Sequence, residues 1–395
     1  MKKVIFGTAL ASMALLSACS SDNDLANVET SANNAIGFHV VGNKAETRAN
    51  IINSTEDLKK TDFNVFAFTR NEDGTDGTIF MGEKANQFGQ KGIKIVHKSG
   101  EWGYANAADI HYWPANTELN FYAVSPGSFE EVQENIEMTV VYGWNISNNT
   151  KTISYNPLDE YAGRTDKKNL DVMYAITEKQ THTPTNGGKV NFQFKHILSQ
   201  VVFKAKTQLE NMEVEINEIK IHNPWTKGTY TLPKTSSEKG TWELTAPTVG
   251  SKWGAFTVVT GKKITVTSNG ADISVDAPML FVPQELTAWD VKKTKAEADT
   301  EHQVYLEITC KIKQETEYVF GSAGTPTGTT AEEKGYKTLY VPFGAIWEPG
   351  KCYTYTLIFG GGYDAQGQAI LQPINFDAEV GEWKNADAKE IGVNK

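Results

Sequence analysis

Cysteine and catalytic motifs are both scarce in this sequence. Only 3 of the 395 residues are cysteine and none forms a CxxC pair, which argues against a structural zinc site built from four Cys or His ligands. HExxH, GxSxG and Walker A motifs are missing as well. The seven histidines stand singly, at His39, His97, His111, His182, His196, His222 and His302. The residue pattern therefore predicts no metal, no cofactor and no enzymatic activity.

Basic residues and long helical runs are also in short supply. The 38 Lys and Arg are outnumbered by 48 Asp and Glu, so the net charge is -10 and no basic surface for nucleic acid is expected. Apolar residues do not recur at helical spacing over long stretches. The chain has instead 33 Gly, 18 Phe and 15 Tyr, a composition typical of strands joined by tight turns. The predicted fold class is all-β.

The N-terminus carries the pattern of a lipoprotein signal. Two lysines precede an apolar stretch, Val4 to Leu16, which is too short for a membrane span of about 20 residues. Small residues then lead to Cys19, whose thiol would receive the acyl chains, such as palmitate, that anchor a mature lipoprotein. We therefore expect a signal peptide at 1–18, a lipidated tether at 19–34, and a surface-exposed location on the cell outer membrane.

Strand-like runs follow one another along the rest of the chain. Early examples are Ile36 to Val41 and Phe63 to Thr69, and ten runs from Val190 onward suit a β-sandwich. A polar stretch with one Pro and a Gly-Gly pair, Thr181 to Lys189, interrupts them. This break predicts two domains, at 35–186 and 187–395.

Several polar segments between these runs are expected to be loops. Asn71 to Gly77 has the Asp-Gly steps of a hairpin loop but lacks the twelfth-position Glu of an EF-hand calcium site. Lys292 to Thr300 and Gly321 to Lys334 are expected to be exposed excursions. Gly360 to Ala365 matches a variant of the dinucleotide fingerprint, but a strand instead of a helix follows, which predicts a hairpin.

Three side chains attract attention within the predicted strands. His196 ends a run in which Phe192 and Phe194 face one way, and it is expected to be a hydrogen-bonded core residue. Cys310 and Cys352 lie in two other runs. They would form a disulfide if these strands are neighbours with suitable geometry, and they are otherwise buried free thiols.

The 9 tryptophans suggest a second function class. Exposed indole rings stack on sugars, so a surface cluster among Trp102, Trp144, Trp253 and Trp289 would indicate a lipid-anchored adhesin that binds host glycans or proteins. The other tryptophans lie at expected strand ends or turns, where a large ring closes the end of a sandwich.

A set of segments spread over nearly the whole mature chain is specific in combination. Besides the lipobox Leu16-Ser17-Ala18-Cys19, it consists of Thr47-Arg48-Ala49, Trp113-Pro114, Leu119 to Ala123, Asp171 to Ala175, Val190 to Lys206, Val341-Pro342, Trp347, Pro349 to Lys351, Tyr353 to Tyr355 and Val380 to Trp383. Together they resemble the fimbrillin family of two-domain lipoproteins from gram-negative anaerobes, the family with Mfa-like members.

The resemblance implies two transthyretin-like (Greek-key) β-sandwich domains and a role as stalk, tip or anchor of a type V fimbria (pilus). It also implies assembly by strand exchange with other fimbrial subunits. A protease would cut after Arg48, the first strand would leave, and Ile36, Phe38 and Val40 would be the side chains withdrawn from the groove. The strands that border such a groove are left with unpaired backbone groups, so a strand of another chain can complete it.

Overall fold

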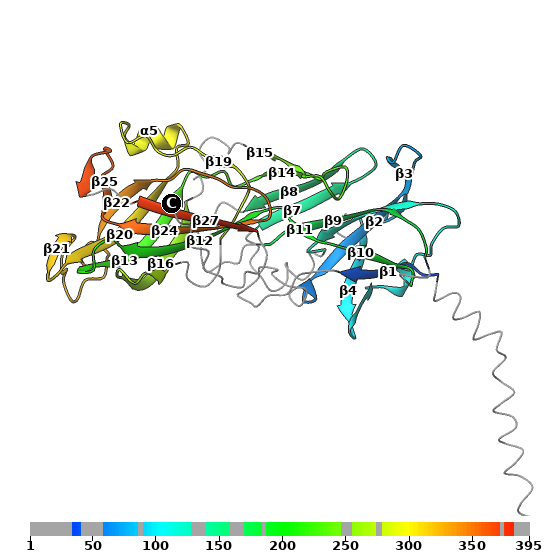
Figure 1. The fold of residues 1–395 in the computed structure, drawn as a ribbon, viewed down its shortest axis with the longest axis horizontal. Coiled ribbons are helices and arrows are strands. Elements are labelled where there is room, and N and C mark those ends of the chain that lie inside the picture. The colour runs from blue at the N-terminus through cyan, green and yellow to red at the C-terminus, as the bar shows by residue number, and fades with distance from the viewer. Residues whose placement is uncertain are drawn as a thin grey trace, which may run out of the picture.

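The computed structural model describes residues 34–40, 58–85, 90–127, 140–157, 170–183, 187–245, 255–273, 279–371 and 375–382. Within these residues the strands form five sheets, and the two helices, Ala107–Asp109 and Lys295–Thr300, are short. No helix in these ranges is long and apolar enough to cross a membrane. The predicted all-β fold is confirmed. The molecule is elongated, with β1 and β4 near one end and β20 to β22 near the other (Figure 1).

The first sheet contains the N-terminal strands. Its members are β1 (Gly37–Val40), β2 (Asp62–Arg70), β3 (Asp76–Met81), β4 (Ile93–Lys98), β5 (Glu101–Tyr104), β6 (Leu119–Ser125), β9 (Met173–Gln180), β10 (Lys189–Phe192) and β11 (Lys195–His196). The order is β10-β1-β5-β4-β2-β6-β9-β11, with β3 beside β2. Only two residues separate β10 from β11, so the two ends of this order meet and the sheet curls on itself. The run predicted as one strand to His196 is therefore divided between both ends of the sheet.

Strand β2 is buried on both faces. Phe63, Val65 and Ala67 point into the curl, whereas Phe66 and Phe68 belong to a second core on the outer face. All five are fully buried. Alternation along this strand therefore separates two cores, as is typical of a central strand covered on both sides.

A four-stranded sheet covers the outer face of the curled sheet. It consists, in order, of β15 (Thr241–Leu244), β14 (Gly228–Thr231), β8 (Lys151–Pro157) and β7 (Val140–Ile146). Tyr155 and Tyr230 bring their rings from this sheet into the second core. Strands β14 and β15 come from beyond residue 187, yet β14 pairs with β8 over four residues (Figure 1). Two sheets therefore contain strands from both sides of the predicted domain boundary at 186/187, and that boundary stays a prediction.

Most of the remaining described strands form two sheets packed face to face. One contains β12 (Ser199–Thr207), β17 (Ala271–Asp272), β18 (Met279–Phe281), β24 (Lys351–Phe359) and β27 (Asn375–Glu382). The other contains β13 (Met212–His222), β16 (Phe256–Val266), β20 (Tyr305–Gln314), β21 (Glu317–Phe320), β22 (Lys337–Pro342), β25 (Gly361–Tyr363) and β26 (Ala369–Leu371). Their inward side chains form one core, which includes Phe203, Ile216, Ile308 and Leu357. A short pair, β19 (Glu285–Leu286) with β23 (Ala345–Ile346), completes the sheets.

The expectation of an exposed excursion at Lys292 to Thr300 is wrong in part. Helix α5 (Lys295–Thr300) forms there, and Thr294 and Glu297 make a reciprocal capping box at its start. Ala298 is fully buried with Trp289 and Tyr305, on the outer face of the sheet that contains β20. The segment is helical because its cap satisfies the first amide groups and one face has an aromatic surface to cover.

Candidate functional site

Strand β1 lies in a groove between two strands that are distant in sequence. It pairs in parallel with β10 over four residues, from Gly37 opposite Lys189 to Val40 opposite Phe192. On its other side it pairs antiparallel with β5, where Phe38 lies opposite Trp102. The groove is therefore walled by β10 and β5, and β1 supplies the backbone partners of both.

The three side chains predicted to leave with the first strand are brought together in this groove. Ile36, Phe38 and Val40 are only 1%, 3% and 4% exposed. All belong to the core inside the curled sheet, whereas His39 between them is exposed. At about 1.5–3 kcal/mol for each large buried side chain, their burial contributes on the order of 6 kcal/mol.

Aromatic rings surround Phe38. Its ring centroid lies 5.4 Å from that of Tyr104 in an edge-on arrangement, and 6.1 Å from that of Phe192 in a stacked one. Phe63 continues the cluster, since its centroid is 5.8 Å from that of Phe192 and 4.9 Å from that of Trp102. Burial raises the pKa of the Tyr104 hydroxyl to about 12. Phe38 is thus the central ring of the groove.

Backbone hydrogen bonds fix the start of β1. The amide of Ile36 donates to the carbonyl of His111 at 2.9 Å, and that of Gly37 donates to the carbonyl of Gly188 at 3.0 Å. The Trp113 amide donates back to the Asn34 carbonyl at 3.0 Å, and its indole Nε1 donates to Gly188 at 2.9 Å. These bonds set the register of the strand.

An open pocket of about 360 Å³ adjoins this end of the groove. Asn34, Trp113 and His182 are among its lining residues. The Trp113 and His182 rings face each other edge-on, with centroids 6.4 Å apart. The chain therefore enters the groove beside an aromatic wall.

Two predicted modification sites lie outside the described residues. These are the lipidation site Cys19 and the processing site Arg48. The described chain resumes at Leu58, which is 3% exposed and packs in the same core as Phe38. The segment that contains Arg48 thus joins two described stretches that both contribute to this core.

The two strand cysteines are free thiols in the structure. Cys310 lies on β20 and Cys352 on β24, which belong to different sheets of the C-terminal sandwich. Cys310 is fully buried and Cys352 is half-buried. Burial raises the pKa of both thiols, that of Cys352 to about 11. The disulfide considered from the sequence is therefore not formed here.

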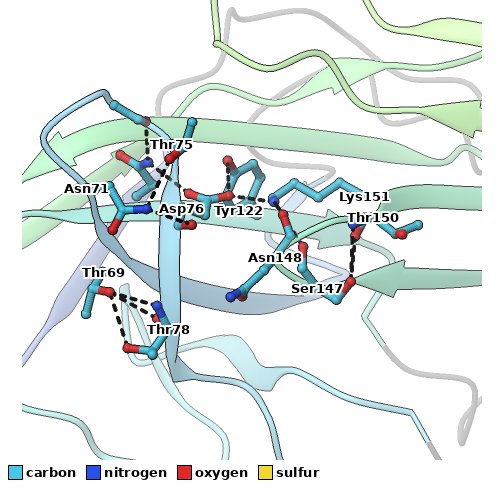
Figure 2. A network of polar contacts seen from close by, with 12 residues as sticks. Thr69, Asn71, Thr75, Asp76, Thr78, Tyr122, Ser147, Asn148, Thr150 and Lys151 are labelled. Atoms are coloured by element: carbon cyan, nitrogen blue, oxygen red, sulfur yellow. Dashed lines mark hydrogen bonds and ion pairs between the residues drawn. The ribbon is translucent and has the colours of Figure 1, made fainter.

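The Asp-Gly loop is a hairpin between β2 and β3, and its carboxylates have protein partners (Figure 2). Asp73 accepts hydrogen bonds from the amide and hydroxyl of Thr75, at 2.9 and 2.6 Å. Asp76 accepts from the Tyr122 hydroxyl at 2.9 Å and pairs with Lys151. Across the described residues no group of three or more His, Cys, Asp or Glu is placed to hold a metal ion.

His196 has a buried carboxylate as its partner. Its Nδ1 lies 3.0 Å from Oδ1 of Asp171, which is 1% exposed. The bond joins β11 to the residues just before β9, where the curled sheet closes. The expectation of a hydrogen-bonded histidine in the core agrees with this contact.

The described tryptophans form no exposed cluster. Three are buried (Trp113, Trp289 and Trp347) and four are half-buried (Trp102, Trp144, Trp225 and Trp242), while Trp253 and Trp383 lie outside the described ranges. Several indole nitrogens donate internally, for example from Trp144 to the carbonyl of Lys91 at 2.9 Å. The surface expected of a glycan-binding alternative is therefore not found in this part of the chain.

The dinucleotide-like Gly360 to Ala365 segment is a hairpin, as expected. Strand β25 turns back into β26, and the amide of Gly367 donates to the carbonyl of Asp364 at 3.0 Å. A strand thus follows the glycines where a nucleotide site would require the start of a helix.

The walls of the groove were not foreseen from the sequence. Trp102, Tyr104 and Gly188 contact β1, whereas the sequence indicates Gly188 only as part of a domain boundary. The alternation of the apolar residues Val190 and Phe192 with polar ones does indicate a strand with one buried face. Such a strand must pair with other strands in a sheet.

The comparisons with known proteins concern nearly the whole chain. The model of the fimbrillin-like family matches residues 47–383. A fimbrial protein from Bacteroides vulgatus has a similar fold, with 16% identity and a TM-score of 0.56, over 89% of this chain and 99% of that chain. A candidate cell adhesion protein from Bacteroides uniformis aligns over 89% of this chain and 100% of that chain, with 14% identity and a TM-score of 0.43. No curated protein sequence matches the chain.

Proposed function

This chain belongs to the fimbrillin-like family, and on that premise we propose that it is a structural subunit, tip or anchor of a surface fimbria that assembles by strand exchange. Its partners are other fimbrial subunits. The first strand, β1, is the element exchanged, and Arg48 is the cleavage site that releases it.

The observation that supports this proposal is the position of β1. It is a short strand that fills a groove between β10 and β5 and places Ile36, Phe38 and Val40 in the core. A sheet that loses such a strand exposes unpaired backbone and apolar surface. A strand from a neighbouring chain restores both, which makes the exchange a driving force for assembly.

Cleavage at Arg48 explains how β1 becomes exchangeable. While the chain is intact, the connection from Val40 to Leu58 holds the strand at a high effective concentration beside its groove, on the order of millimolar. After a cut in this connection, a dissociated strand is diluted and a competing strand can replace it.

The lipid anchor belongs to the same proposal. A chain that keeps an acylated Cys19 stays tethered to the outer membrane through the residues before Asn34, whereas a chain that loses β1 also loses its tether. Retention of the lipid therefore suits an anchor, and removal suits a stalk or tip subunit.

The test is a pair of substitutions in the cleavage segment. Arg48→Ala should abolish polymers of this chain on intact cells, and Lys44→Ala, a nearby basic residue, should leave them unchanged. Mass spectrometry of the mature N-terminus should find a chain that starts at Ala49 in the polymer and a lipidated Cys19 in the Arg48→Ala variant. Unaltered polymers in the Arg48→Ala variant would remove the cleavage step.

A further inference from the structure

We propose that the β1 groove selects its incoming strand by an aromatic side chain at the position of Phe38 and by one chain direction, parallel to β10. The inference rests on the proposed function and specifies the kind of partner that the groove accepts. Its recognition pattern is a strand with large apolar residues at alternate positions, an aromatic residue in the middle and a small residue before it.

The aromatic requirement follows from the shape of the groove around Phe38. Tyr104 contacts one side of the ring and Phe192 stacks on another, at centroid distances of 5.4 and 6.1 Å. The site is closed, because Phe38 is 3% exposed and Phe192 fully buried. A smaller side chain would leave a cavity beside Phe192, whose ring packs on Phe63, which in turn packs on Trp102.

The requirement for a small residue comes from the contact between Gly37 and Lys189. A Cβ atom added at Gly37 would lie 3.0 Å from Cγ of Lys189, closer than ordinary contact. The two residues are direct neighbours in the parallel register, so a β-branched residue there would crowd the Lys189 side chain and force it out of its present position.

The direction of the strand follows from its two different neighbours. β1 runs parallel to β10 and antiparallel to β5, and its first residues meet the carbonyls of His111 and Gly188. Parallel and antiparallel ladders place their hydrogen bonds at different spacings. A reversed strand could still bury alternate apolar residues, but its amide groups would not face these carbonyls in the same register.

The experiment uses the full chain with a site-specific protease sequence in place of residues 44–48, cut after purification. The bound β1 segment is then exchanged against labelled peptides of residues 34–40, in mild denaturant if needed, and dissociation constants are measured by fluorescence anisotropy. Phe38→Ala in the peptide should weaken binding by about 100-fold, the effect expected for emptying a buried aromatic site. Gly37→Val should weaken it by about tenfold or more. For the chain direction, a cysteine in place of Asn34 of the peptide should form a disulfide with His182→Cys of the chain, because Asn34 and His182 line the same pocket, whereas a cysteine added after Val40 should not.

The matched control is a peptide with His39→Ala. The side chain of His39 is exposed between two buried neighbours, so this peptide should bind within about threefold of the native one. Equal binding of the native and Phe38→Ala peptides, or a disulfide from the Val40 end of the peptide in place of the Asn34 end, would overturn the proposed selection while leaving strand exchange intact. If no peptide enters the groove, not even the native sequence, strand exchange itself fails.

Discussion

Nζ of Lys151 lies 2.5 Å from Oδ2 of Asp76, and the two side chains are only 12% and 6% exposed. The ammonium group also lies over the rings of Phe68 and Tyr122, 4.9 and 4.7 Å from their centroids. Asn120 donates to the other carboxylate oxygen at 2.9 Å. Because Asp76 begins β3 and Lys151 begins β8, this pair links the curled sheet to the sheet that covers it (Figure 2).

Loss of the cation should destabilise the protein strongly. Lys151→Met leaves the Asp76 carboxylate buried without its counter-charge, and we expect the free energy of unfolding to fall by about 3 kcal/mol in urea titrations. Lys239→Met is the control, because Lys239 is 82% exposed and its pair with Glu348 should contribute less than about 0.5 kcal/mol. Equal effects of the two substitutions would contradict the structural role of the buried pair.

The free thiols should be slow to react in the folded chain. With a pKa of about 11, Cys352 has about 100-fold less thiolate at pH 8 than a cysteine of ordinary pKa 9, and Cys310 is fully buried. In a Cys19→Ser form, aromatic disulfide reagents should detect two thiols per chain in denaturant without reductant and almost none before unfolding. Variants Cys310→Ser and Cys352→Ser separate the two signals, and the absence of both thiols in denaturant would reveal a disulfide.

Alkaline pH should destabilise the groove through Tyr104. Its pKa is about 12 in the folded chain and about 10 when unfolded, so its stabilising contribution is complete below pH 10 and is lost as the pH rises towards 12. Between pH 9 and 11 the wild type should lose on the order of 1 kcal/mol more than Tyr104→Phe, as judged from urea unfolding at each pH. An equal loss in the Tyr104→Phe variant would contradict this role of the Tyr104 hydroxyl.

A fragment that ends at the predicted domain boundary should not fold. Residues 34–186 lack β10, which pairs with β1, and β14, which pairs with β8. Tyr230, 2% exposed in the second core, would also be missing. Circular dichroism and urea titration should therefore show no cooperative transition for this fragment, while the full chain unfolds cooperatively. A cooperative transition would support the boundary taken from the sequence.

The sequence predicted those parts of the fold that depend on neighbouring residues. The alternation of Ile36, Phe38 and Val40 indicates a strand with one buried face, and all three are buried. In β2 every residue from Asp62 to Phe68 is buried, and a period of two cannot distinguish a second core from a solvated face when both sides are apolar.

The remaining features depend on contacts between distant segments. The parallel pairing of β1 with β10 and the attachment of β14 to β8 cross most of a predicted domain, and no local pattern records such partners. Helix α5 has only six residues, too few for a helical period to be recognised. Its Thr294-x-x-Glu297 capping box was the available signal.

The placement of β1 also bears on how the chain behaves before it meets a partner. Unpaired strand edges are the usual starting points of aggregation. β1 pairs with the backbone groups of both β10 and β5, so these strand edges are covered in the intact chain and aggregation at this site is suppressed. Under the proposed strand exchange, the same short strand would control both solubility and polymerisation.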